Sequence, residues 1–341
     1  MSLLQVSDLH VWFDLPTGAK VHAVQGVSFE LREGERFGLV GESGSGKTTT
    51  ILALMGLLPP TATLAGQVRL DGRDILAGGE DSVRRYRWKD IAMVFQGAMN
   101  ALNPVKTVRW QIAEPMAFHG VAEGAAARQR AGELLEMVGI HAAAGDRYPH
   151  EFSGGMRQRA SIAMALACEP RILLADEPTT ALDVMVQAQI LELLTRLSDE
   201  LGLALILVTH DLPVVAQTCE RAAVMYAGEI AEQGPMETLF HQPRHPYTRL
   251  LFAATPDLYG NDQVVSIPGM PPRLDQDITG CPFRPRCDVV VHRCEAEHPA
   301  LRPVGLLHEA ACHRNDGSGG NSSNSGNSSG NGGRDDLPEA I

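Results

Sequence analysis

The first 240 residues alternate between short apolar runs and longer stretches that have the spacing of helices. The apolar runs have the length of strands and read RFGLV, IAMVF, ILLAD and ALILVTH. The helical stretches include TTTILALMGLL and MVQAQILELLTRLSDEL. A regular alternation of strands and helices is typical of a mostly parallel sheet flanked by helices, so we predict an α/β fold for this part of the chain.

The pattern changes twice after this main domain, which we place at residues 1–240. Residues 241–315 lack the periodicity and are rich in proline and cysteine, so we expect a small appended module there. Residues 316–341 consist largely of glycine, serine and asparagine, a composition typical of a disordered tail.

Composition and charge narrow the class of protein. The 341 residues include 29 Lys and Arg against 41 Asp and Glu, which gives a net charge of −12. Such a chain repels polyanions on average, so we expect no nucleic-acid partner and only local phosphate binding. The N-terminus MSLLQVSDLH lacks the pattern of a signal peptide, and runs such as LALILV are too short to span a bilayer. We therefore expect a soluble, cytosolic chain.

The segment GESGSGKT, residues 41–48, lies between a predicted strand and a predicted helix, which is the context of a phosphate-binding P-loop. Its glycines allow backbone N–H groups to surround the β and γ phosphates at the positive end of the helix. Lys47 would neutralise phosphate charge, and the Thr48 hydroxyl would ligate Mg²⁺. A glycine turn without function is the alternative. The predicted nucleotide-binding residues are Gly41, Ser43, Gly44, Ser45, Gly46, Lys47, Thr48 and Thr49.

Two further predicted strands end in residues that carry chemistry. ILLADE ends in Asp176 and Glu177, and ALILVTH ends in His210. Ligands of open α/β sheets bind beyond the carboxyl ends of the strands, so we expect these side chains near the P-loop. Asp176 would hold Mg²⁺ through water, and Glu177 would activate the attacking water. The alternatives are a polar strand end for the two carboxylates and a capping or core role for His210.

A second anion site is predicted where Ser153, Gly154 and Gly155 precede a helical stretch, because a hydroxyl and free N–H groups meet there. The sequence SGGMRQ resembles the signature motif of ATP-binding cassette (ABC) ATPases, with Met in place of the usual Gln. In that family two cassettes pack head to tail, and the signature of one closes on the ATP of the other. The resemblance therefore implies ATP as the nucleotide and a dimer with shared sites.

The other motifs of the ABC family are present in the same order. Gln96 in MVFQGAMNALNP matches the Q-loop, which senses the γ-phosphate, helps to hold Mg²⁺ and contacts the membrane subunit. Asp183 in TTALD matches the loop that crosses the dimer interface, and His210 matches the histidine that holds the γ-phosphate. An aromatic residue near the N-terminus usually stacks on adenine. We prefer Phe13 for that role, with Trp12, or a core role for Phe13, as alternatives.

The resemblance covers about residues 3–240 and implies a fold and a reaction. The fold is a P-loop NTPase (RecA-like) ABC cassette with an antiparallel β subdomain and a helical subdomain at about 97–160. The reaction is hydrolysis of ATP with Glu177 as the general base. Lys47, His210 and Mg²⁺ on Thr48 and Asp176 would stabilise the charge of the transferred phosphoryl group.

HEFSGGMRQR, FQGAMNALNP and HPYTRLL resemble, more narrowly, the ATPase subunits of bacterial dipeptide, oligopeptide and nickel importers. This implies a second ATPase subunit from a different chain, two transmembrane permease subunits, an extracytoplasmic solute-binding protein and a place at the cytoplasmic face of the membrane. Di- and oligopeptides are the favoured solutes, and nickel, glutathione or another small solute is the alternative. A soluble ABC ATPase of DNA repair or translation is a further alternative, but we find neither a coiled-coil insertion nor a second cassette.

The helical lobe after Gln96, at about residues 97–152, is the part that the resemblance assigns to the membrane subunit. A groove there would receive a short helix from that subunit. Met99, Leu102 and Met116 would contribute to it or would form the core of the lobe, which is the commoner place for apolar residues at helical spacing.

Four of the six cysteines lie in one C-terminal segment, at Cys281, Cys287, Cys294 and Cys312. Their intervals of five, six and seventeen residues contain no tight pair of the kind that structural zinc sites use, and they suit an iron–sulfur cluster better. A resemblance to peptide-importer ATPases with this cysteine pattern also implies a [4Fe–4S] cluster.

Zinc and a redox-sensing disulfide are the alternatives for these four cysteines, and the neighbouring histidines keep a mixed Cys/His zinc site open. A metal centre would act as a structural staple for a segment with little apolar core, or as a redox sensor that gates transport. Cys168 and Cys219 lie in apolar surroundings, and we expect both in the core.

Overall fold

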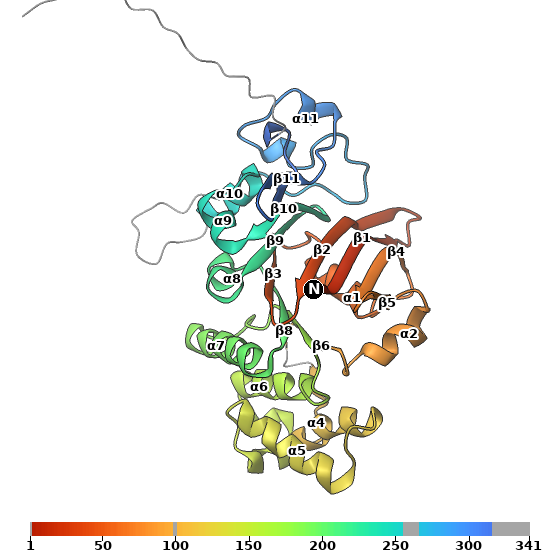
Figure 1. Ribbon diagram of the computed structural model, residues 1–341, viewed down its shortest axis with the longest axis vertical. Helices are drawn as coiled ribbons and strands as arrows, with labels where there is room; N and C mark the ends of the chain where they lie inside the picture. The colour runs from red at the N-terminus through yellow and green to blue at the C-terminus, as the bar shows by residue number, and fades with distance from the viewer. Residues whose placement is uncertain (1, 98–100, 255–265, 316–341) are drawn as a thin grey trace, which may run out of the picture.

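The computed structural model describes residues 2–97, 101–254 and 266–315. These residues form two β-sheets with helices packed on them, a helical lobe at one end and a C-terminal segment at the opposite end (Figure 1).

The larger sheet is built around five parallel strands. They are β3 (Arg36–Val40), β6 (Ile91–Val94), β7 (Ile172–Asp176), β8 (Ala204–Thr209) and β9 (Arg221–Tyr226). Three antiparallel strands continue it at one edge, namely β10 (Glu229–Pro235), β11 (Arg302–Gly305) and β12 (His308–Ala310). The order across the sheet is β11-β12-β10-β9-β3-β8-β7-β6. Every residue of β7 and β8 is buried, as expected for parallel strands that are covered on both faces.

The smaller sheet is antiparallel. It contains β1 (Ser2–Asp14), β2 (Lys20–Arg32), β4 (Ala62–Leu70) and β5 (Arg73–Asp74) in the order β2-β1-β4-β5. Along β2 the side chains of Val27, Phe29 and Leu31 are buried while the residues between them are not. This alternation is that of a sheet with one covered face. The predicted fold class, an α/β cassette with an antiparallel β subdomain, is confirmed.

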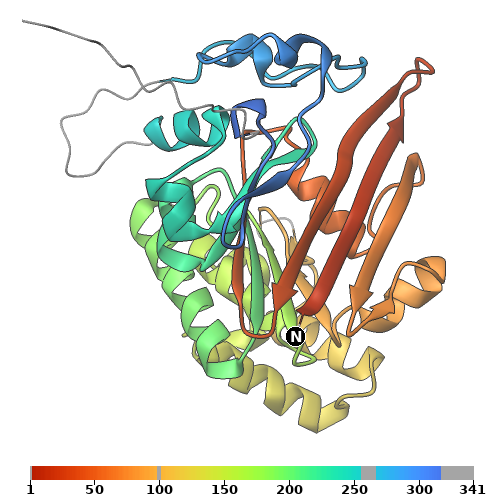
Figure 2. The ribbon, with the colours of Figure 1, turned by 45° about the horizontal axis from the view of Figure 1, so that its top comes forward.

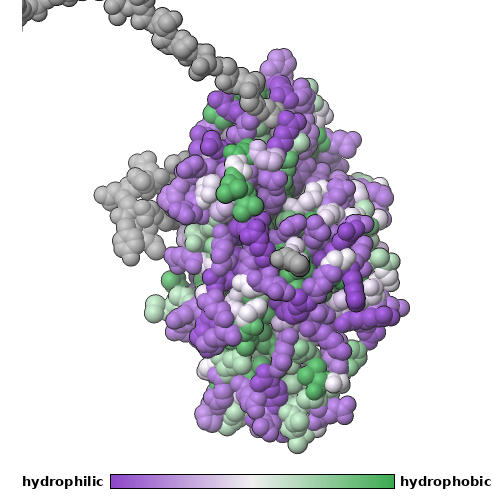
Figure 3. All heavy atoms as spheres, viewed as in Figure 1, coloured by the Kyte–Doolittle hydropathy of each residue, from purple (hydrophilic) through white to green (hydrophobic). Residues whose placement is uncertain are grey.

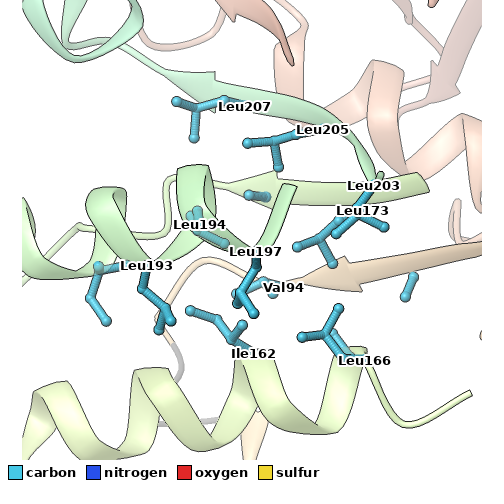
Figure 4. Packing of buried hydrophobic residues seen from close by; sticks show 14 of the residues in the cluster. Val94, Ile162, Leu166, Leu173, Leu193, Leu194, Leu197, Leu203, Leu205 and Leu207 are labelled. Atoms are coloured by element: carbon cyan, nitrogen blue, oxygen red, sulfur yellow. The ribbon is translucent and has the colours of Figure 1, made fainter. Parts of the chain in front are cut away.

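Helices and the smaller sheet cover the two faces of the larger sheet. On one face lie α6 (Gly154–Ala165), α7 (Val184–Leu201), α8 (Leu212–Thr218) and α9 (Met236–His241). Figure 4 shows the apolar side chains of α6 and α7, among them Ile162 and Leu197, turned toward residues of β6, β7 and β8 such as Leu173. On the other face, α1 (Lys47–Leu54) is packed together with the smaller sheet.

The helical lobe consists of α4 (Val108–Phe118), α5 (Gly124–Met137) and the adjoining α6, and α2 (Gly79–Tyr86) lies near the smaller sheet (Figure 1). Leu102 and Met116 are buried in the large core, so the core alternative weighed for them is confirmed. Met99 lies outside the described residues.

The C-terminal segment is more closely joined to the main domain than an appended module would be. After α10 (Pro246–Ala253) and α11 (Arg293–Ala296), the chain returns and adds β11 and β12 to the edge of the larger sheet, as Figure 2 shows. The Glu232 carboxylate of β10 is fully buried and lies 2.7 Å from Nε2 of His308 on β12. The sequence analysis predicted an appended module from residue 241, but not that its strands join the larger sheet.

The face of the molecule in Figure 3 is mostly hydrophilic, with hydrophobic side chains in small groups. No helix in the described part of the chain combines the length and the apolar character that crossing a membrane requires. The predicted tail, residues 316–341, lies outside the described residues.

Candidate active site

The P-loop connects the end of β3 to the start of α1, and two of its glycines are required by their surroundings. Gly41 has a φ of +149°, and a Cβ atom there would lie 2.2 Å from the carbonyl oxygen of Met225. Gly46 has a φ of +102°, and a Cβ atom there would lie 2.6 Å from the carbonyl oxygen of Ala23. Residues with a side chain fit neither position. The loop can therefore stay close to the neighbouring strands while its backbone turns into α1.

Lys47, the first residue of α1, points its ammonium group back into this loop. Nζ donates hydrogen bonds to the carbonyl oxygens of Gly41, at 2.8 Å, and of Glu42, at 2.9 Å. Burial lowers the pKa of Lys47, and the nearby carboxylates of Glu177, Asp176 and Glu42 counteract the shift. A cation that is partly removed from water attracts a phosphate group more strongly than an exposed one, so this group is suited to binding a polyphosphate.

Asp176 and Thr48 meet beside the P-loop. The Thr48 hydroxyl of α1 donates a hydrogen bond of 3.1 Å to the Asp176 carboxylate at the end of β7. Burial raises the pKa of Asp176 to about 6, and the charge of Glu177 adds to the shift, whereas Thr48 and Lys47 lower it. A carboxylate and a hydroxyl at this spacing are oxygen ligands of the kind that Mg²⁺ prefers, so these two residues fit a magnesium ion bound to phosphate.

Glu177 is the centre of a polar cluster at the same edge of the sheet. Its Oε2 accepts hydrogen bonds from Gln96 Nε2, at 2.7 Å, and from the Thr180 hydroxyl, at 2.9 Å. Its Oε1 lies 3.2 Å from Nδ1 of His210. Glu177 has a φ of +43°, an uncommon value for a residue with a side chain, which often marks a functional position. The structure thus brings together Gln96, Glu177 and His210, which are far apart in the sequence, and adds Thr180, which the sequence analysis missed.

The second predicted anion site lies at the start of α6. The Ser153 side chain caps the helix by accepting a hydrogen bond of 3.3 Å from the backbone N–H of Met156. A Cβ atom on Gly155 would lie 2.7 Å from Cγ1 of Val186, so a glycine is needed where α6 and α7 approach each other. Asp183 caps α7 by accepting a hydrogen bond of 3.0 Å from the N–H of Val186. The signature and the TTALD segment are therefore neighbours.

This signature is not joined to the P-loop of its own chain. In the described residues, no hydrogen bond links Ser153, Gly154 or Gly155 to residues 41–48. Next to Asp183, the apolar side chains of Val184 and Met185 are 78% and 71% exposed. Two exposed apolar side chains next to a helix N-terminus are typical of a surface that contacts another protein, and not of a binding site that is complete within one chain.

The two aromatic candidates for adenine stacking have different surroundings. Phe13 is partly buried and packs against the core cluster that contains residues of α1. Trp12 stacks on His22, with ring centroids 4.6 Å apart, and on His10. Because neighbouring residues of a strand point to opposite faces, only one of them can face this core, and Phe13 does so. Its role in adenine stacking stays a prediction.

The cysteine segment does not show a metal site. Burial raises the pKa of Cys281 to about 11, and the nearby Cys294 and Cys312 thiols add to the shift. All six cysteines are free thiols, and no group of three or more His, Cys, Asp or Glu side chains in the described ranges is placed to hold a metal ion. The predicted [4Fe–4S] cluster and the alternative zinc site are thus not supported by this geometry.

Three of the histidines near these cysteines have other partners. His298 lies 2.9 Å from a Glu229 carboxylate oxygen, and His308 lies 2.7 Å from the Glu232 carboxylate. His313 lies 2.8 Å from the carbonyl oxygen of Glu297. The described structure therefore gives no support to a mixed Cys/His zinc site. Cys168 and Cys219 are buried, which confirms the prediction that both lie in the core.

Comparisons with known proteins agree with this geometry. Residues 24–180 match the family "ABC transporter", and residues 231–294 match "Oligopeptide/dipeptide transporter, C-terminal region". The chain is 47% identical over 320 residues to the probable peptide ABC transporter ATP-binding protein y4tR of Sinorhizobium fredii, covering 92% of this chain and 95% of the relative. It is 44% identical over 317 residues to the dipeptide transport ATP-binding protein DppD of Escherichia coli, covering 92% of this chain and 97% of the relative.

Solved structures agree as well. The dimeric structure of MJ0796, a bacterial ABC transporter cassette, is similar with a TM-score of 0.60 and 32% identity, over 68% of this chain and 98% of that one. The structure of cbiO1 from Clostridium perfringens, part of the ABC transporter complex cbiONQ, has a TM-score of 0.58 and 29% identity, over 71% of this chain and 91% of that one. The P-loop, the polar cluster around Glu177, the signature and the C-terminal region place this chain in the family of ABC transporter ATP-binding proteins, among those with an oligopeptide/dipeptide transporter C-terminal region.

Proposed function

We propose that this chain is the ATP-hydrolysing subunit of an ABC importer and that it powers the uptake of di- or oligopeptides. The observation that carries the proposal is the presence, in one chain, of a complete cassette and of a C-terminal region that matches oligopeptide/dipeptide transporters. Relatives with both parts are named as dipeptide transport ATP-binding proteins in Escherichia coli and Bacillus subtilis.

The reaction that we propose for the site is hydrolysis of ATP by water. Glu177 acts as the general base, since its carboxylate is fixed by Gln96 and Thr180 and faces His210. Lys47 and His210 stabilise the charge of the γ-phosphoryl group as it is transferred. Thr48 and Asp176, with Gln96, would hold Mg²⁺, and this ion would neutralise phosphate charge.

We further propose that ATP is closed in by the signature of a second ATPase subunit. Support comes from the absence of any hydrogen bond between Ser153, Gly154 or Gly155 and the P-loop within the described chain, and from the exposed Val184 and Met185 beside Asp183. The similar MJ0796 cassette is dimeric. The expected partner is a different ATPase chain.

The surface next to the helical lobe is the proposed contact with the permease. A hollow of about 290 Å³ lies between α2 and α4 and is lined by Arg84, Trp88, Phe118 and His119, among others. Phe118 is 64% exposed, and the Arg84 guanidinium lies 5.3 Å from its ring centre. An apolar ring flanked by cations suits a short amphipathic helix that carries acidic residues. This contact would hold the chain at the cytoplasmic face of the membrane, beside two permease subunits and their solute-binding protein.

Metal binding by Cys281, Cys287, Cys294 and Cys312 stays a proposal that rests on their spacing in the sequence. The described side chains are not placed to hold a metal ion, so binding requires them to rearrange. Analysis of metal and acid-labile sulfide in protein purified without oxygen tests it. Equal amounts of iron and sulfide support a [4Fe–4S] cluster, and stoichiometric zinc supports a zinc site. If neither metal is found, the segment binds no metal.

The solute is tested in cells that lack this subunit. Restoring the gene should restore uptake of a radiolabelled dipeptide or oligopeptide, whereas a gene that encodes Glu177→Gln should not. Restoration of nickel uptake alone would replace peptide by nickel as the solute. If restoring the gene changes the uptake of no small solute, the proposal that this chain belongs to an importer is contradicted.

A further inference from the structure

The C-terminal segment reaches the P-loop through an ion pair. The guanidinium of Arg286 donates two hydrogen bonds to the carboxylate of Glu42, at 2.6 and 2.9 Å. The Arg286 side chain is only 2% exposed, and its Nε donates to the carbonyl oxygen of Pro268 at 2.8 Å. A buried guanidinium that grips both oxygens of a carboxylate fixes the direction as well as the position of that side chain.

A second contact from the same segment fixes the backbone at Glu42. The N–H of Glu42 donates a hydrogen bond of 2.9 Å to the hydroxyl of Tyr247, which is fully buried. The Tyr247 ring packs against Tyr226 and Phe283, with centroid distances of 4.6 and 5.4 Å. A ring held in this way has little freedom to move. Residue 42 is therefore fixed at both its side chain and its peptide group by residues outside the cassette motifs.

Glu42 in turn holds the groups that face the nucleotide. Its carbonyl oxygen accepts hydrogen bonds from Lys47 Nζ, at 2.9 Å, and from the N–H of Ser45, at 3.2 Å. A rotation of the Glu42 peptide would move the acceptor of Lys47 and the loop that surrounds the phosphates. A continuous series of contacts thus runs from Arg286 and Tyr247 through Glu42 to Lys47.

Arg286 is also fixed to the cysteine segment. It ends a short 3₁₀ turn, Arg284–Arg286, that lies between Cys281 and Cys287. The N–H of Arg284 donates to the carbonyl of Cys281 at 3.1 Å, and the N–H of Cys287 donates to the carbonyl of Arg284 at 3.3 Å. These bonds join Cys281 and Cys287 to Arg284, and the N–H of Arg286 donates to the carbonyl of Phe283 at 3.0 Å, so Arg286 lies on a turn that is bonded to both cysteines.

We propose that Arg286 and Tyr247 are positioning residues for the P-loop, and that through them the C-terminal segment sets the affinity of this chain for MgATP. This proposal concerns only the binding of nucleotide, so it does not depend on which solute the transporter carries. If the contacts only anchored the segment, their loss would lower thermal stability and leave the affinity of the folded chain unchanged.

The test measures binding of the slowly hydrolysed analogue AMPPNP, with Mg²⁺, to the full-length chain. Arg286→Met removes the ion pair and keeps an unbranched apolar side chain, and we expect the Kd to rise about tenfold, the usual effect of losing a charge-assisted contact. Arg284→Met is the matched control, because Arg284 is on the same turn and its guanidinium has no ion pair in the described residues. Its Kd should equal that of the parent chain.

Glu42→Gln separates positioning from charge. Arg286→Met leaves the Glu42 carboxylate uncompensated near the phosphates, whereas Glu42→Gln removes that charge. If the Arg286–Glu42 pair positions the P-loop, Glu42→Gln also weakens the binding of AMPPNP. The double variant Arg286→Met/Glu42→Gln then binds AMPPNP no more weakly than either single variant does. If Arg286 only neutralises charge, Glu42→Gln binds as tightly as the parent chain or more tightly, and the proposal fails.

Tyr247→Phe keeps the test valid if the Arg286 variant does not fold. It removes only the acceptor of the Glu42 N–H and keeps the packed ring, so circular dichroism should match that of the parent chain. A raised Kd for AMPPNP supports the proposal. An unchanged Kd in both Tyr247→Phe and Glu42→Gln contradicts it, whatever happens to the melting temperature.

Discussion

Glu177 is the residue on which hydrolysis depends most directly in this account. Its carboxylate is held by Gln96 and Thr180 and faces His210, so it is oriented without being fully buried, at 18% side-chain exposure. Glu177→Gln keeps the shape but cannot accept a proton from water. We expect ATP binding to persist and turnover in the assembled transporter to fall at least about a hundredfold. Phosphate release measures this, with Glu192→Gln on the exposed side of α7 as the control. Hydrolysis at the normal rate would remove Glu177 from its role.

Asp176 makes stability depend on pH. Its pKa is about 6 in the folded chain against an ordinary value of 3.8, chiefly because of burial. The folded state therefore binds more protons than the unfolded state between these values, and stability falls as pH rises through that window. Above pH 6 the folded chain carries a buried charge that Asp176→Asn removes. In the absence of Mg²⁺ and nucleotide, we expect the variant to be more stable at pH 8 by up to about 3 kcal/mol.

Urea unfolding of the two chains at pH 8 and at pH 5 measures this difference in the free energy of unfolding. The difference should narrow at pH 5, where the native carboxyl group is largely protonated. Equal stability at pH 8 would mean that Asp176 is not destabilised by its surroundings.

Single residues show how far a sequence can specify a site. Lys47, Asp176 and Glu177 were predicted because they follow strands or loops whose pattern is local and recognisable. Thr180 and Tyr247 lie in segments that resemble the family, and Arg286 lies in no such motif, but no local pattern pointed to their contacts. Only the fold brings them within hydrogen-bond distance of Glu177 or Glu42. The iron–sulfur prediction relied on the spacing of the cysteines and on a resemblance to ATPases with the same pattern, and neither determines how the thiols are oriented in this chain.

The approach of α6 to α7 is the feature of the elements that most constrains the signature. A Cβ atom on Gly155 would lie 2.7 Å from Cγ1 of Val186, whereas one on Gly154 would lie 3.5 Å from Leu182, an ordinary contact. Gly155→Ala should therefore destabilise the chain by about 1–3 kcal/mol, and Gly154→Ala should have little effect. Thermal unfolding of the chain alone measures both. Adding Val186→Ala to Gly155→Ala should restore part of the loss, and equal stability of the two single variants would contradict the close packing.

Among the elements, length decided what could be predicted. β7, β8 and α7 have five to eighteen residues with clear apolar patterns, and they lie where the sequence places them. β11 and β12 have four and three residues, too few to show a period, so their addition to the larger sheet was not predicted. The sheet therefore continues past the boundary that composition suggested near residue 240.

At the scale of the whole molecule, the proposed shared ATP site needs a second cassette. Val184 and Met185 are exposed beside Asp183, where a partner would pack. Met185→Glu should weaken the association with the second ATPase subunit that MgATP induces in a Glu177→Gln background, because it places a charge in an apolar contact. Light scattering on the mixture measures association. Leu306→Glu is the control, since Leu306 is 90% exposed on the distant turn between β11 and β12. Equal loss in both variants would place the interface elsewhere.

The central claim, that this cassette drives peptide import, is tested most directly in proteoliposomes that contain the assembled transporter with its solute-binding protein. The measurement is ATP hydrolysis together with accumulation of a labelled dipeptide or oligopeptide. The account predicts that the peptide-loaded binding protein stimulates hydrolysis and that uptake ceases with Glu177→Gln in this chain. Peptide uptake that continues at the normal rate with Glu177→Gln, or hydrolysis that no peptide stimulates, would contradict it.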